Sequence, residues 1–134
     1  MSALIDQLKA EHKIVLALMD EATKVLGDVK ETGQKLIKIK SGLLGHLKKE
    51  DEYLYPALLR IAPQNPQLDA LLSVFGNDMM IVSKTAIEFL DKYSGNATGA
   101  EFRRELGVFS AALRRRIANE ERLLYPEFER LNVG

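Results

Sequence analysis

The sequence contains no cysteine, which excludes disulfide bonds, thiolate zinc sites, iron–sulfur clusters and a cysteine nucleophile. It also lacks net charge, because 19 basic and 19 acidic residues cancel. A chain of balanced charge gives no reason to expect nucleic acid or an anionic membrane as a partner. Histidine is scarce as well, with only His12 and His46 present.

Long apolar runs and targeting signals are also lacking. The first residues have no basic region followed by an apolar run, and no stretch approaches the ~20 apolar residues of a membrane span. We therefore expect no signal peptide, no membrane association and a cytoplasmic location. With 134 residues the chain is long enough to bury one core, so we expect a single domain over residues 1–134.

No segment alternates apolar and polar residues in the manner of a strand, whereas apolar residues recur with helical spacing throughout the chain. The spacing predicts helices over about 2–27, 34–61, 67–93 and from 98 onward. Ser2 and Asn65 are expected to cap helices, and Thr98 with Glu101 reads as a capping box. Four amphipathic helices joined by short loops predict an all-α, antiparallel up-and-down four-helix bundle.

Several polar residues interrupt these apolar stripes. His12 lies in the first stripe, and His46 and Glu50 lie four residues apart in the second, which places them on one helix face. Asp78 interrupts the third stripe, and the fourth stripe has charges at Arg116 and Glu120, so these three positions also face inward. An unpaired buried charge is expensive, so these groups require compensation, and a metal ion is the leading candidate.

An internal repeat links the two halves of the chain. Glu50, Leu54, Tyr55 and Pro56 recur seventy positions later as Glu120, Leu124, Tyr125 and Pro126, and an acid follows each Glu at Asp51 and Glu121. The second hairpin therefore looks like a copy of the first. In this register Arg116 takes the position of His46, and Asp78 roughly matches His12. Pro56 is expected to kink or end the regular part of its helix.

The order of His12, His46, Glu50 and Glu120, together with the repeated Leu-Tyr-Pro segment, resembles the hemerythrin-like family, the His-His-Glu (HHE) cation-binding domain. The resemblance covers nearly the whole chain. It implies a four-helix bundle with a non-heme di-iron centre, used in the family for oxygen binding, oxygen or redox sensing, iron handling and repair of nitrosative stress. It also implies that His12, His46, Glu50 and Glu120 are metal ligands.

The second half of the chain departs from the family pattern. Asp78 stands where the family has a helix-three histidine, Val82 lies one turn later, and Arg116 replaces the helix-four histidine. Three inward carboxylates and one arginine leave a charge that one divalent cation would balance. We therefore predict a single non-heme iron, with zinc as another ion that suits these ligands, and Arg116 paired with Asp78 and Glu120 where a second metal would lie.

Three function classes remain open at this stage. The first is a metal-binding module for sensing or for handling iron, O2 or NO. The second is a metal-free scaffold or interaction domain in which the charges of Asp78, Arg116 and the glutamates replace the metal. The third is an oxidoreductase, which needs an open coordination site and a substrate cavity. Because no substrate pocket is signalled in the sequence, we expect the chain not to be an enzyme, and its protein partner stays open.

Overall fold

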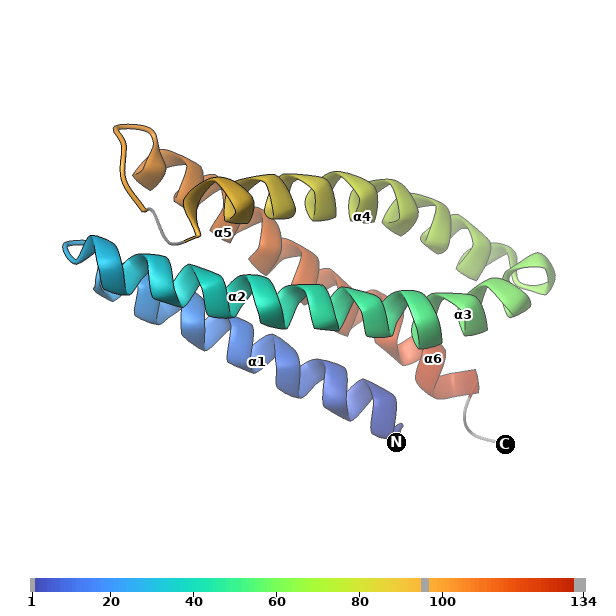
Figure 1. The fold of residues 1–134 in the computed structure, drawn as a ribbon. Coiled ribbons are helices and arrows are strands. Elements are labelled where there is room, and N and C mark those ends of the chain that lie inside the picture. Colours follow the sequence, from blue (N-terminus) through green and yellow to red (C-terminus); the bar gives the residue numbers. More distant parts are fainter. Residues whose placement is uncertain (1, 95–96, 132–134) are drawn as a thin grey trace.

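The structure is a computed structural model that describes residues 2–94 and 97–131, apart from the side chain of Met79. The long helical rods run alternately up and down, as predicted (Figure 1), and the described residues contain no strand. The rods comprise α1 (Ala3–Lys24), α2 (Val29–Lys49) with its extension α3 (Tyr55–Ile61), α4 (Pro66–Tyr93), and α5 (Phe102–Asn119) with its extension α6 (Tyr125–Leu131). The all-α four-helix bundle is therefore confirmed.

Two of the helix starts follow the predicted caps. The Ser2 hydroxyl accepts a hydrogen bond from the Ile5 amide at 3.4 Å, and the Asn65 side chain accepts one from the Leu68 amide at 3.1 Å. Pro66 then occupies the first turn of α4, where its missing N–H costs nothing. These two helix starts could be predicted from the sequence because each capping side chain bonds to an amide in the first turn of its own helix.

Two other predicted starts are wrong. The second helix begins at Val29 rather than near residue 34, because the Asp28 side chain caps it by accepting from the Glu31 amide at 3.0 Å. The last helix begins at Phe102, after Glu101, whose side chain makes no capping hydrogen bond. The capping box predicted from Thr98 and Glu101 therefore does not open this helix.

Both halves of the repeat contain a wider, π-helical turn. These turns are η1 (Glu50–Leu54) and η3 (Glu120–Leu124), each followed by a seven-residue α-helix. In the first, the Tyr55 amide donates to the Glu50 carbonyl, and in the second the Tyr125 amide donates to the Glu120 carbonyl. The kink expected at Pro56 thus takes the form of a π-turn, a feature often found at functional sites.

The apolar core consists of two clusters on either side of a polar layer. The first cluster contains Val15, Met19, Leu36, Ile39, Leu43, Ala86, Phe89, Leu90, Tyr93, Ala97, Phe102, Leu106, Phe109, Leu113 and Ile117. The second contains Ile5, Leu8, Leu54, Leu58, Ala62, Leu68, Leu72, Phe75, Leu124, Tyr125 and Phe128. The chain passes from one cluster to the other at His12, at His46 to Glu50 and at Arg116 to Glu120, so these buried polar residues form a layer between them.

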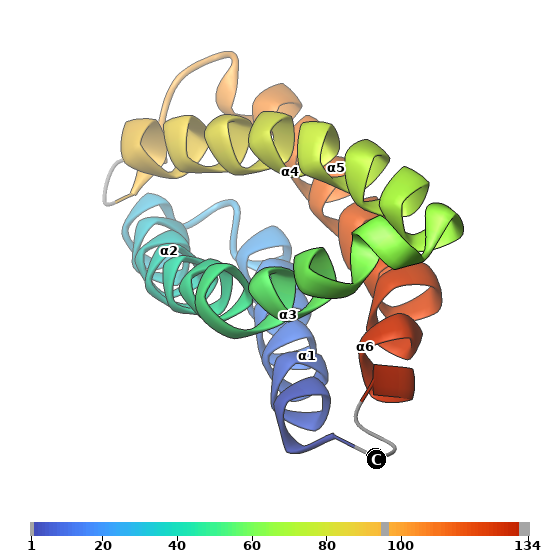
Figure 2. The same cartoon turned by 90° about the vertical axis from the view of Figure 1, so that its right-hand side faces the viewer.

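Helix α4 leaves three large apolar side chains exposed, those of Val74, Met80 and Ile81. Figure 2 shows α4 along one outer side of the bundle, with α1 and α2 packed together on the other side of the view. By length and composition alone α4 could cross a membrane, and only 18% of its most apolar window is buried inside the bundle. The prediction that no stretch of the chain approaches the apolar length of a membrane span is therefore wrong for α4.

Candidate metal centre

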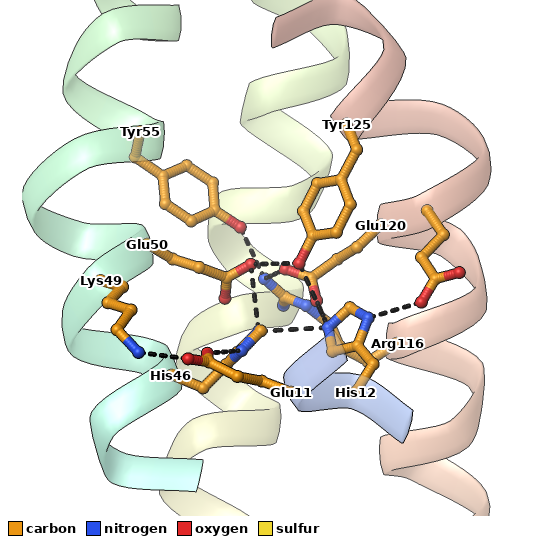
Figure 3. A network of polar contacts seen from close by, with 10 residues as sticks. Glu11, His12, His46, Lys49, Glu50, Tyr55, Arg116, Glu120 and Tyr125 are labelled. Atoms are coloured by element: carbon orange, nitrogen blue, oxygen red, sulfur yellow. Dashed lines mark hydrogen bonds and ion pairs between the residues drawn. The ribbon is translucent and has the colours of Figure 1, made fainter. Parts of the chain in front are cut away.

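The four predicted ligands meet in the buried polar layer. His12 comes from α1, His46 from the last turn of α2, Glu50 from η1 and Glu120 from η3, and their side chains converge (Figure 3). Their exposed fractions are 3, 4, 1 and 2%, respectively. The structure therefore places all four at one interior point, as the sequence pattern predicts.

The donor atoms of these residues are close to one another. The two imidazole Nε2 atoms of His12 and His46 are 3.1 Å apart, and His12 Nε2 lies 3.3 Å from Glu120 Oε1. His46 Nε2 lies 3.5 Å from Glu50 Oε2. Ligand atoms of His12, His46 and Glu120 all fall within 4.8 Å of one another, so these three residues form a group that could hold a metal ion, with Glu50 beside it.

The outer nitrogen of each imidazole is held by a carboxylate. His12 Nδ1 lies 2.7 Å from Glu121 Oε2, and His46 Nδ1 lies 2.9 Å from Glu11 Oε1. Glu11 also pairs with Lys49. A carboxylate can only accept, so each Nδ1 donates to its acid, and the Nε2 atom of each ring faces the centre of the site. Metal-binding histidines commonly have this arrangement.

Glu11 was not predicted to be part of the site, and Glu121 was predicted only as a member of the repeat. Each of these acids is the immediate chain neighbour of a predicted ligand, Glu11 of His12 and Glu121 of Glu120. Neighbouring side chains on a helix point in directions about 100° apart, so each acid reaches the histidine of another helix. An acid next to His12 and another next to Glu120 were the available signal.

Two tyrosines connect the halves of the repeat. The Tyr125 hydroxyl, from the second half, donates to Glu50 Oε2 at 2.9 Å and lies 3.1 Å from His12 Nε2. The Tyr55 hydroxyl, from the first half, accepts from the Arg116 guanidinium at 2.7 Å. Each Leu-Tyr-Pro segment therefore supports the polar group of the opposite hairpin.

Arg116 is buried where the repeat would place a histidine. Its side chain is 4% exposed, with nitrogens 3.5 Å from Glu120 Oε2 and 3.9 Å from Asp78 Oδ2. The guanidinium carbon also lies 5.6 Å from the centre of the Phe75 ring. The predicted pairing of Arg116 with both acids is confirmed, although Asp78 is partly exposed rather than fully inward.

The electrostatics of the layer favour a shared proton in the metal-free protein. Burial is the largest influence on the pKa of Glu120 and, with repulsion from the Glu50 carboxylate, raises it to about 7, although the hydrogen bond with His12 opposes this shift. Burial also acts to raise the pKa of Glu50, but hydrogen bonds from His46 and Glu120 lower it overall. The pKa of His46 is raised because the carboxylates of Glu50 and Glu11 outweigh the opposing effect of burial. A divalent ion would have to displace the proton on Glu120.

A small cavity of about 20 Å³ lies against the polar layer. A volume of this size accommodates roughly one water-sized molecule. The polar part of its wall consists of His12, His46, Glu50, Ser83, Arg116 and Glu120, and the rest is formed by Val15, Leu43, Leu47, Val82, Ala86, Leu113 and Ile117. The cavity thus joins the four predicted ligands to an apolar lining from four helices.

The comparison with protein families agrees with this geometry. The profile of the family described as the hemerythrin HHE cation-binding domain matches residues 3–128, nearly the whole chain. The chain belongs to this family. Neither the curated proteins nor the solved structures contain a significant match to this hemerythrin-type domain. Because the family is a cation-binding one, a metal ion is the partner that the fold and the buried group both indicate.

The spacing of the donor atoms in this hemerythrin-type domain suits a metal ion. Two ligands bound at roughly 2.1 Å stand about 3.0 to 3.4 Å apart for angles between a right angle and tetrahedral. The separations of 3.1 Å between His12 and His46 and 3.3 Å between His12 and Glu120 fall in that range. Glu50 Oε1 is buried and has no hydrogen-bond partner among the described residues, which leaves it available to a cation.

Proposed function

We propose that this domain binds one divalent transition-metal ion, a non-heme iron(II), through His12, His46, Glu50 and Glu120. The observation that carries the proposal is the pair of imidazoles whose Nδ1 atoms are held by acids while their Nε2 atoms face each other at 3.1 Å. Two imidazoles and two carboxylates suit iron(II), and zinc binds the same donors, so zinc is the second candidate ion.

The charges around Arg116 support one ion rather than two. Glu50, Asp78 and Glu120 contribute three negative charges, and Arg116 contributes one positive charge that is permanent at any physiological pH. The remainder of minus two matches one divalent cation. A second cation would have to bind beside the buried guanidinium, without the two imidazoles that Asp78 and Arg116 replace. The oxygen carriage that needs two irons is therefore not part of the proposal.

The cavity supports a role in sensing or in handling iron, O2 or NO. Its size suits a diatomic molecule or a water, and its lining places such a molecule next to the proposed ligands. A bound iron would supply the coordination chemistry, while the domain supplies the ligands, their orientation and an apolar surround. A cavity of this size favours a small ligand of this kind over an organic substrate, so an oxidoreductase acting on an organic molecule is not the function we propose. The cytoplasmic location stays a prediction.

A metal-free scaffold is the second candidate function, and the contacts of Arg116 with Glu120 and Asp78 favour it. Metal analysis separates the two functions. We expect one iron per chain after anaerobic loading and desalting of protein purified without chelator, measured by inductively coupled plasma mass spectrometry. No bound metal under any loading would support the scaffold instead, and two ions per chain would contradict the single-ion site.

The pH dependence of the same titration gives a second readout. The metal-bound form needs Glu120 ionised, and the metal-free form has a pKa of about 7 there. Iron affinity should therefore fall by at least about tenfold per pH unit well below pH 7, because each bound ion displaces the proton of Glu120 and, since the pKa of His46 is also raised, the proton of that imidazole as well. A pH-independent affinity between pH 5.5 and 7 would place the ion away from Glu120.

The acids that hold the Nδ1 atoms should tune this affinity. Glu121→Gln and Glu11→Gln remove the negative charge that orients His12 and His46, and we expect each to weaken metal binding by about 10- to 100-fold. Competition with a chromophoric chelator measures the change. Glu52→Gln, an acid in the same π-turn as Glu50 that pairs with Lys48, serves as the control and should leave affinity unchanged. If both test variants bind metal with wild-type affinity, the carboxylates of Glu11 and Glu121 do not contribute to metal binding.

A further inference from the structure

The outer face of α4 carries a stripe that the bundle leaves uncovered and that has no charged residue before its last member, Lys84. Ala70, Val74, Asn77, Ile81 and Lys84 follow one another at steps of four, three, four and three residues, which places them on one helix face. Val74 and Ile81 are 67% and 66% exposed, and Asn77 is exposed between them. Met80, which flanks the stripe, is 73% exposed.

This stripe is unusual for the chain. Between Asp69 and Lys84 the sequence has a single charged residue, Asp78, and that side chain turns toward Arg116. Elsewhere the exposed positions carry charge at nearly every turn, as in the lysines of residues 35–49 and the arginines of residues 103–116. Exposed apolar positions that recur along one helix face without charge mark a surface that binds a partner.

The charges along α4 are complementary to those of α4 in a second copy when the two helices pack antiparallel. If two copies pack antiparallel about a twofold axis at Asn77, Val74 lies within one residue rise, about 1.5 Å, of Ile81 in the other copy. Lys84 then lies level with Ala70 and next to Asp69 of the other copy. The two Asn77 side chains meet at the axis, where their amides can hydrogen-bond to each other.

The charges at the two ends of the stripe are available for such contacts. Neither Asp69 nor Lys84 forms an ion pair with another described residue, and both are exposed. The antiparallel arrangement brings opposite charges together at both ends of the stripe, whereas a parallel arrangement would align like charges. Charge complementarity thus selects a second copy of this chain in the antiparallel orientation.

We propose that this domain forms a homodimer through α4, with the helices antiparallel about Asn77 and Val74 packed against Ile81 of the other copy. One helix pair of about four turns is a small interface, so the dimer is a weak one, with a dissociation constant of about 1 to 100 µM. The metal centre lies on the opposite, inward side of α4, and the dimer does not depend on metal binding.

Sedimentation velocity across this concentration range tests the dimer. We expect wild-type protein to shift from monomer to dimer, and Ile81→Lys to raise the dissociation constant at least tenfold. Ile14→Lys is a matched control, because Ile14 has a similar exposure of 60% but lies on α1. A wild-type protein that stays monomeric, or that sediments with phosphatidylcholine vesicles instead of forming dimers, would overturn the proposal.

A mixing experiment tests the orientation of the helices. Val74→Glu alone and Ile81→Lys alone should each be monomeric, since each buries a charge against an apolar side chain. Mixed together, the two variants should form a heterodimer within about threefold of wild-type affinity, because the new acid faces the new base only in the antiparallel register. Failure of the mixture to associate, while the wild-type protein dimerises, would reject this register.

Discussion

His46→Ala is expected to abolish stoichiometric metal binding. The variant removes one of the two imidazoles and leaves His12 without the Nε2 atom that faces it at 3.1 Å. Four ligands of a structural metal site together supply about 10 to 16 kcal/mol, so the loss of one should weaken binding by roughly 100- to 1,000-fold. Metal analysis after desalting measures this loss directly, and competition with a chelator gives its size.

Thermal stability provides an independent readout of the same variant. A ligand that binds only the folded state stabilises it, by about 2.7 kcal/mol when the free ligand is at 100 times its dissociation constant. We expect iron to raise the melting temperature of the wild-type protein and to leave that of His46→Ala unchanged. Lys48→Ala, an exposed change in the same helical turn, should behave as wild type. Full metal content in His46→Ala would show that the ion binds elsewhere.

The sequence predicted the fold because its signals act within single helices. The helical spacing of apolar residues and the caps at Ser2 and Asn65 each depend on residues a few positions apart, and the structure has both. Pro56 also predicted a local irregularity, and the structure has a π-turn there and a second one, which was not predicted, in the other half of the repeat. The capping box at 98–101 failed because a short motif does not decide where tertiary packing starts a helix.

The convergence of the predicted ligands followed from the same reasoning. Once four helices must pack with their apolar stripes inward, His12, His46, Glu50 and Glu120 have to meet, since each replaces an apolar residue at the level between the two core clusters. The exposure of Asp78 at 35% was not predictable in this way, because its position lies at the edge of the stripe. Its final placement depends on how α4 is rotated against α5.

The contacts of Glu11 and Glu121 with the histidines could not be read from the sequence. Each acid lies off the inward stripe of its own helix, and its partner is 35 or 109 residues away. Only the packing of α1 against α2 and against η3 brings these atoms together. The hydrogen bonds of Tyr125 with Glu50 and of Tyr55 with Arg116 could not be predicted for the same reason, although both tyrosines belong to the repeat.

Arg116→Ala is expected to destabilise the metal-free protein by about 3 to 5 kcal/mol, because removal of one partner leaves buried carboxylates without their counter-charge. The guanidinium is 4% exposed, contacts Glu120 and Asp78, and donates to the Tyr55 hydroxyl. Urea unfolding measures the loss. Arg115→Ala, at an exposed position one residue away, is the matched control and should change stability by less than about 0.5 kcal/mol.

Two further measurements separate the charge of Arg116 from its packing. Arg116→Met fills a similar volume without the charge, so a loss of similar size in both variants would identify the charge as the stabilising feature. Because either variant raises the negative charge of the layer to minus three, a bound divalent cation should recover part of the lost stability, which metal addition tests. A group that takes the place of a second metal ion must stabilise the carboxylates that this ion would bind. If Arg116→Ala instead melts like wild type and takes up the same amount of metal, Arg116 does not have that role.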